Sequence, residues 1–111
     1  MSRDPALYLA DILDACLRIE RFAEGKTDAQ IFDDEVVRDA ILFNIVVIGE
    51  AAASLTAEVQ GRYPAVPWSR IKAMRNMVAH EYFGLESALV LDVVRHKVPE
   101  LLLAIKPTLS R

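Results

Sequence analysis

The sequence lacks most of the features on which disulfide-stabilised, membrane-spanning or β-rich proteins depend. Among its 111 residues there is one cysteine, Cys16, so no disulfide can form within the chain. The longest stretch without a charged residue, residues 40–49, is far shorter than the ~20 apolar residues that cross a bilayer. Residues 1–20 are interspersed with charge, unlike a signal peptide, and no segment alternates convincingly between polar and apolar residues. We therefore expect a cytoplasmic, all-α protein.

Metal and cofactor motifs are equally scarce. The only histidines are His80 and His96, and neither has a cysteine at zinc spacing or belongs to a Glu-x-x-His pattern of di-iron bundles. No glycine-rich phosphate loop is present. His96 lies between two basic residues, which favours a solvated position on a helix surface. We therefore expect no metal ion and no bound cofactor.

Charge is distributed unevenly along the chain. The net charge of −3 argues against a protein that coats nucleic acid through bulk charge. However, no acidic residue lies between Glu58 and Glu81, and this segment contains four basic residues, namely Arg62, Arg70, Lys72 and Arg75. An acidic protein with one basic segment can still bind an anion at that segment.

The apolar content is high for a small protein. Hydrophobic residues make up 53% of the chain, and residues 40–49 are apolar on nearly every side of a helix. Such a helix is normally surrounded by protein, so we expect one of its faces to meet a second subunit. Asn44 is the only polar residue in this segment. We interpret it first as a hydrogen-bonded core residue that fixes the packing register, and second as a neighbour of an active site.

Apolar residues spaced three and four positions apart predict helices within a single domain of residues 1–111. Cys16 lies in the apolar stripe of the first helix, which favours packing in the core over a reactive thiol. Gly25 is a plausible stop for this helix, and Thr27 with Gln30 predicts a capping box for a short helical turn. Asp33 or Asp34 then caps a long helix over about residues 36–59.

The second half of the chain predicts two more helices. One covers about residues 68–82 and is ended by Gly84. The last begins near residue 86, kinks or breaks at Pro99, and ends at Pro107. Together the elements predict an antiparallel bundle of four to five helices with short connections.

The segment RNMVAHEYF, residues 75–83, carries three polar residues that are costly to bury, Arg75, His80 and Tyr82. Arg75 and Tyr82 are seven positions apart and share one helical stripe, whereas His80 is turned about 140° from Arg75. The three can meet only if the arginine curls around the helix, if the helix frays before Gly84, or if two subunits join. Spacing alone equally allows a solvated patch or a structural hydrogen-bond network.

The chemistry that suits these side chains is cleavage of RNA without a metal ion. That reaction needs a base for the 2′-hydroxyl, an acid for the leaving 5′-oxygen, and a cation for the charge that builds on the phosphate. Histidine can serve as either acid or base near neutral pH, and arginine binds phosphate through two hydrogen bonds. Because this segment has one histidine, a two-fold dimer would be needed to supply two.

Residues 67–83, PWSRIKAMRNMVAHEYF, resemble the HepT-like toxins of the HEPN superfamily, whose motif is arginine, four residues, histidine, one residue, tyrosine. The resemblance extends to IGEAAASL at residues 48–55 and VPELL at residues 98–102. It implies a HEPN-like helical homodimer with two motifs facing one cleft. It further implies a metal-independent endoribonuclease, acting on tRNA or mRNA as the toxin of a type VII-like toxin–antitoxin pair. The partner would be a MntA-like minimal nucleotidyltransferase antitoxin that transfers AMP from ATP to the motif tyrosine.

The resemblance also implies roles for individual residues. Arg75 would bind phosphate and stabilise the transition state, His80 would be the general acid and base, and Asn76 would orient or bind. Tyr82 would accept AMP, which adds negative charge and bulk that obstruct RNA. Three further residues are expected to line the cleft: Glu50, Asn44 and Lys72.

Two other functions are compatible with the same residues. The chain could be a non-catalytic helical subunit that binds nucleotide or a protein partner within a nucleotidyltransferase complex. It could also be a plain helical dimerisation module in which Arg75 and His80 only support the structure. A small nucleotidyltransferase encoded next to this chain would favour the RNase toxin and the binding subunit over the dimerisation module.

Overall fold

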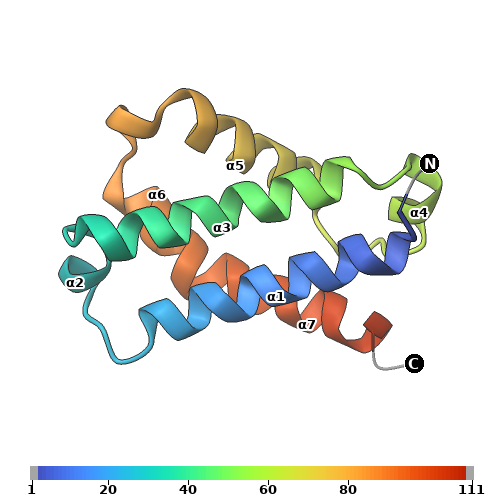
Figure 1. Ribbon diagram of the computed structural model, residues 1–111, viewed down its shortest axis with the longest axis horizontal. Coiled ribbons are helices and arrows are strands. Elements are labelled where there is room, and N and C mark those ends of the chain that lie inside the picture. Colours follow the sequence, from blue (N-terminus) through green and yellow to red (C-terminus); the bar gives the residue numbers. More distant parts are fainter. Residues whose placement is uncertain (1–2, 110–111) are drawn as a thin grey trace.

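The expected all-α architecture is confirmed by the computed structural model, which describes residues 3–109, with side chains described through residue 106. Two long helices, α1 (Pro5–Ala23) and α3 (Glu35–Ala53), run antiparallel at the centre of the bundle (Figure 1). Helix α5 (Trp68–His80) packs on α3, and α7 (Val98–Leu109) packs on α1. The shorter elements are α2 (Asp28–Phe32), α4 (Ala57–Gly61), a 3-10 turn (Tyr82–Gly84), α6 (Ser87–Asp92) and a π-helical turn (Val93–Lys97).

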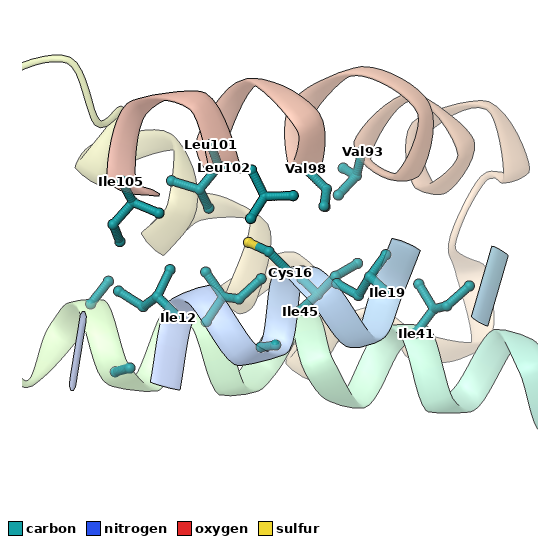
Figure 2. Close-up of a cluster of buried hydrophobic side chains, with 14 of the residues drawn as sticks. Ile12, Cys16, Ile19, Ile41, Ile45, Val93, Val98, Leu101, Leu102 and Ile105 are labelled. Carbon is teal, nitrogen blue, oxygen red and sulfur yellow. The ribbon is translucent and has the colours of Figure 1, made fainter. Parts of the chain in front are cut away.

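The core lies between α1, α3 and α7, where branched aliphatic side chains interlock around Cys16 (Figure 2). Ile12 and Ile19 of α1 and Ile41 of α3 are completely buried. Burying each such side chain contributes roughly 1.5–3 kcal/mol of transfer free energy. This layer holds α3 in place, and α3 in turn is the surface on which α5 packs.

Local capping signals correctly place several helix ends. Thr27 and Gln30 form the predicted capping box, with both reciprocal hydrogen bonds present. The Asp34 carboxylate accepts hydrogen bonds from the backbone N–H groups of Val36 and Val37, which begins α3. Gly25 has φ +71°, the left-handed conformation that glycine adopts readily just after a helix.

Three predicted helix limits are wrong in detail. Helix α3 ends at Ala53 rather than near residue 59, because the Thr56 side chain accepts a hydrogen bond from the Val59 N–H and begins α4. Helix α7 continues past Pro107 to Leu109. Helix α5 ends at His80 rather than near residue 82, and the chain continues as the 3-10 turn. The distortion predicted at Pro99 is present, and it takes the form of a π-helical turn over Val93–Lys97, just before the proline. In a regular α-helix the ring of Pro99 would crowd the carbonyl group of Arg95, which lies in this π-helical turn.

No helix within residues 3–109 is long and apolar enough to cross a membrane.

The buried position of Cys16 leads to a prediction about its reactivity. Burial in the apolar core raises the pKa of the Cys16 thiol to about 12, so almost no reactive thiolate exists at neutral pH. We expect no reaction with an aromatic disulfide reagent in the native protein, and complete reaction in concentrated guanidinium chloride. A Ser87→Cys variant provides the control, because residue 87 is exposed and its thiol should react at once. Fast labelling of native Cys16 would contradict the packing around α1.

Candidate functional site

Helix α5 lies directly against the backbone of α3 where Arg75 crosses Gly49. A Cβ atom added to Gly49 would overlap the Cβ and Cγ atoms of Arg75. Only glycine therefore lets the arginine stem lie directly on the α3 backbone. As a result the Arg75 side chain is only 18% exposed.

Two side chains hold the Arg75 guanidinium. Its Nε donates to Asn76 Oδ1 at 3.1 Å, and its Nη1 donates to Glu50 Oε1 at 3.3 Å. Three of the residues predicted to work together, Arg75, Asn76 and Glu50, therefore form one cluster. The Glu50 carboxylate is 65% exposed, so this ion pair is weak and a phosphate group could replace it.

His80 is the last residue of α5, and its side chain is exposed. No hydrogen bond or ion pair joins it to another side chain in the part of the chain described. The imidazole is therefore open to solvent and to a substrate. Within one chain, neither His80 nor Tyr82 contacts Arg75 among the described interactions.

Tyr82 lies beyond the end of α5, in the 3-10 turn, where the chain passes over the N-terminal half of α3 (Figure 1). Its hydroxyl donates a hydrogen bond of 2.6 Å to Asp39 Oδ1. Arg38 Nε lies 3.5 Å from the same carboxylate oxygen. The hydrogen bond to Asp39 raises the pKa of the Tyr82 phenol above its ordinary value, because the charged acceptor favours the protonated form.

The sequence interpretation did not single out Asp39 or Arg38. A signal was available, because Asp39 and Glu50 are eleven positions apart and therefore share one helical stripe. Both acidic residues face the segment that carries Arg75 and Tyr82.

The other two candidate cleft residues lie elsewhere. Asn44 is buried, and its amide donates to the Ala40 carbonyl at 2.8 Å and accepts from Arg18 of α1 at 3.4 Å. These contacts support the interpretation of Asn44 as a core residue that fixes packing register. Lys72 is exposed and borders a shallow depression together with Gln60, Trp68 and Ser69. Within the described residues, no three histidine, cysteine, aspartate or glutamate side chains are grouped so as to hold a metal ion.

Comparison with known proteins identifies the family. Residues 12–107 match the family described as "Ribonuclease HepT-like", a range that contains all the site residues above. The chain belongs to the HepT-like family. Among curated relatives of this HepT-like chain, a "Putative RNase" of Methanocaldococcus jannaschii is 32% identical over 97 residues, covering 87% of the chain and 80% of that protein. A "Probable ribonuclease HepT" of Thermococcus cleftensis is 28% identical over 101 residues, covering 91% and 92%.

One further relative of the HepT-like chain is longer. The "Gamma-glutamylcyclotransferase and putative RNase" of Methanocaldococcus jannaschii is 33% identical over 101 residues. The match covers 91% of this chain but only 46% of that protein, so the chain spans less than half of its length. No solved structure matches the HepT-like chain significantly.

Proposed function

We propose that this HepT-like chain is an endoribonuclease that cleaves RNA without a metal ion, using Arg75 and His80 as catalytic residues. The observation that supports this most is the position of the Arg75 guanidinium, which Glu50 and Asn76 hold at the surface. The same helix, α5, ends at His80, which is exposed. The names of the curated relatives point to the same class of reaction.

In the proposed reaction, an RNA phosphate replaces Glu50 at the guanidinium of Arg75. Arginine stays charged and binds two phosphate oxygens at once, so it stabilises the charge that develops in the transition state. One histidine takes the proton of the 2′-hydroxyl, which attacks phosphorus, and a second protonates the leaving 5′-oxygen. The products are a 2′,3′-cyclic phosphate and a free 5′-hydroxyl. Asn76 keeps the guanidinium oriented through its hydrogen bond to Nε.

A homodimer would supply the second histidine. Phe43 and Phe83 are 67% and 100% exposed, and these large apolar side chains support the proposal that a second copy covers this surface. Phe43 shares its helical stripe on α3 with Glu50, the partner of Arg75. Pairing two copies through this face would bury both copies of Phe43 and place two Arg75 and His80 pairs beside one cleft.

The proposed biological role is that of a toxin whose antitoxin is a MntA-like minimal nucleotidyltransferase. The antitoxin would transfer AMP from ATP to the Tyr82 hydroxyl. The partly exposed position of Tyr82, two residues after His80, supports this assignment. An added adenylate would bring negative charge and bulk next to the site and repel RNA phosphate.

RNA cleavage by the purified protein in EDTA tests the nuclease, with total tRNA and a long single-stranded RNA as substrates. We expect cleavage that leaves 2′,3′-cyclic phosphate ends. Arg75→Lys keeps the charge and the aliphatic stem but loses the two-pronged phosphate contact, so the rate should fall about 10²-fold. Arg62→Lys is the matched control, because Arg62 forms only an exposed ion pair with Glu58.

Equal rates for the Arg75→Lys and Arg62→Lys variants would contradict the proposed role of Arg75. Absence of cleavage by the unmodified wild-type protein, combined with calorimetric binding of nucleotide, would instead favour the non-catalytic binding subunit.

A further inference from the structure

The hydrogen bond between Tyr82 and Asp39 joins two residues that are 43 positions apart in the sequence. The bond is short, at 2.6 Å between the phenol and carboxylate oxygens, as is typical of a hydroxyl that donates to a charged carboxylate. It connects the 3-10 turn after α5 to the first half of α3, so the phenol is held in one place rather than extending freely into solvent.

The hydrogen-bonded pair of Tyr82 and Asp39 is accessible to solvent. The Asp39 side chain is 42% exposed, and Tyr82 is only partly buried. A small charged molecule can therefore reach the phenol oxygen while that oxygen still contacts the carboxylate. A hydrogen bond that served only to stabilise the fold would gain more from complete burial, where competing water is excluded.

Arg38 gives the site a cation. Its Nε lies 3.5 Å from Asp39 Oδ1, and its Nη1 donates to the Phe32 carbonyl at 3.2 Å, which fixes the direction of the guanidinium. The interaction with Tyr82, followed by the charge of Asp39, raises the pKa of Arg38. A phenol, a carboxylate that accepts its hydrogen bond and a guanidinium thus lie together at one surface position.

We propose that Asp39 is the general base, and Arg38 the phosphate-binding residue, for nucleotidyl transfer to Tyr82. This inference rests on the proposed function, in which Tyr82 accepts AMP from ATP, and it adds the residues of this chain that make the tyrosine a nucleophile. In protein kinases an aspartate likewise accepts the proton of the substrate hydroxyl during phosphoryl transfer.

The Tyr82 oxygen attacks the α-phosphorus of ATP and forms a new P–O bond. The bond from that phosphorus to the oxygen that bridges to the β-phosphate breaks, and pyrophosphate leaves with the electron pair. The phenol proton moves along the existing hydrogen bond to Asp39, which later releases it to solvent. Arg38 neutralises charge on the non-bridging oxygens.

Transfer also removes the contact that held the tyrosine. The phenol oxygen becomes part of a phosphodiester and can no longer donate to Asp39, while the new negative charge is repelled by Asp39 and attracted by Arg38. The modified tyrosine would therefore exchange its carboxylate partner for the guanidinium.

The intact chain can be tested without the nucleotidyltransferase, using a fluorophosphonate probe whose phosphorus accepts a phenol oxygen and releases fluoride. Peptide mass spectrometry then compares Tyr82 with Tyr8 and Tyr63, which are also partly buried and serve as internal references. If Asp39 is a general base, Tyr82 should be labelled about 10²-fold faster than either reference near neutral pH. If the hydrogen bond is only structural, Tyr82 should be the slowest of the three, because its phenol is held in the protonated form.

The Asp39→Asn variant separates a general base from a purely structural hydrogen-bond acceptor. The amide keeps an oxygen that accepts the hydrogen bond and so keeps the tyrosine in place, but it cannot take up the proton. We expect labelling of Tyr82 to fall to the rate of Tyr8 and Tyr63, whereas Asp28→Asn, which alters an exposed partner of Arg95, should have no effect. Circular dichroism verifies that each variant is folded.

Labelling of Tyr82 that is unchanged or faster in the Asp39→Asn variant would overturn the assignment of Asp39. The RNA-cleavage assay in EDTA is independent of this result, so failure of the nuclease and failure of the base can be told apart. RNA cleavage together with slow, Asp39-independent labelling would support the nuclease and contradict the role of Asp39 as the general base.

Discussion

His80→Ala is expected to reduce RNA cleavage about 10²- to 10⁴-fold, the usual loss when a general acid or base is removed. The fold should remain intact, because His80 is exposed at the end of α5 and surface substitutions usually change stability by less than about 0.5 kcal/mol. The measurement is the initial rate of tRNA cleavage in EDTA, with the thermal midpoint of unfolding recorded on the same preparations.

His96→Ala is the matched control for this experiment. His96 is the other histidine of the chain, it is also exposed, and it lies in the π-helical turn rather than at the end of α5. We expect its removal to leave the cleavage rate unchanged. If both variants cleave RNA at the wild-type rate, His80 is not the acid or base, and contamination by another nuclease becomes the explanation for cleavage.

Gly49→Ala should destabilise the protein, although it adds only one methyl group. The new Cβ would overlap the Cβ and Cγ of Arg75, atoms close to the backbone that cannot swing aside, so α5 must move away from α3. We expect a stability loss of about 1–3 kcal/mol from overpacking, in spite of a gain of up to ~1 kcal/mol in helix propensity. Cleavage should be lost as well, because Arg75 is displaced from the position at which we propose that it binds phosphate.

Urea unfolding followed by circular dichroism measures this effect, and Gly61→Ala provides the control. Gly61 is also a helical glycine, but no atom lies within 4 Å of the position its Cβ would take. The Gly61→Ala variant should be as stable as the wild type or slightly more so. Equal unfolding midpoints for the two variants would show that α3 and α5 do not meet closely at Gly49.

Local structure followed from local sequence wherever the cause was a short-range contact. The capping box of Thr27 and Gln30 and the cap at Asp34 involve residues two to three positions apart, so composition and spacing are sufficient to predict them. The sequence predicts the end of α3 about six residues too far along the chain, because residues 36–59 retain helical periodicity. The cap at Thr56, which begins α4 instead, depends on a single side-chain hydrogen bond. Periodicity indicates which face is apolar, but it does not show where a helix stops.

The residues of the candidate site also fall into two groups, those that the sequence predicts and those that only helix packing brings together. The sequence alone determined that Arg75, Asn76 and His80 occupy one helix, and their chemistry pointed to phosphate and to proton transfer. The sequence did not determine which acidic residues meet them. Only the packing of α5 on Gly49 brings Glu50 to Arg75, and only the turn after His80 carries the Tyr82 hydroxyl to Asp39. These contacts join residues 25 and 43 positions apart, so they depend on how whole helices pack, a property that no short stretch of sequence encodes.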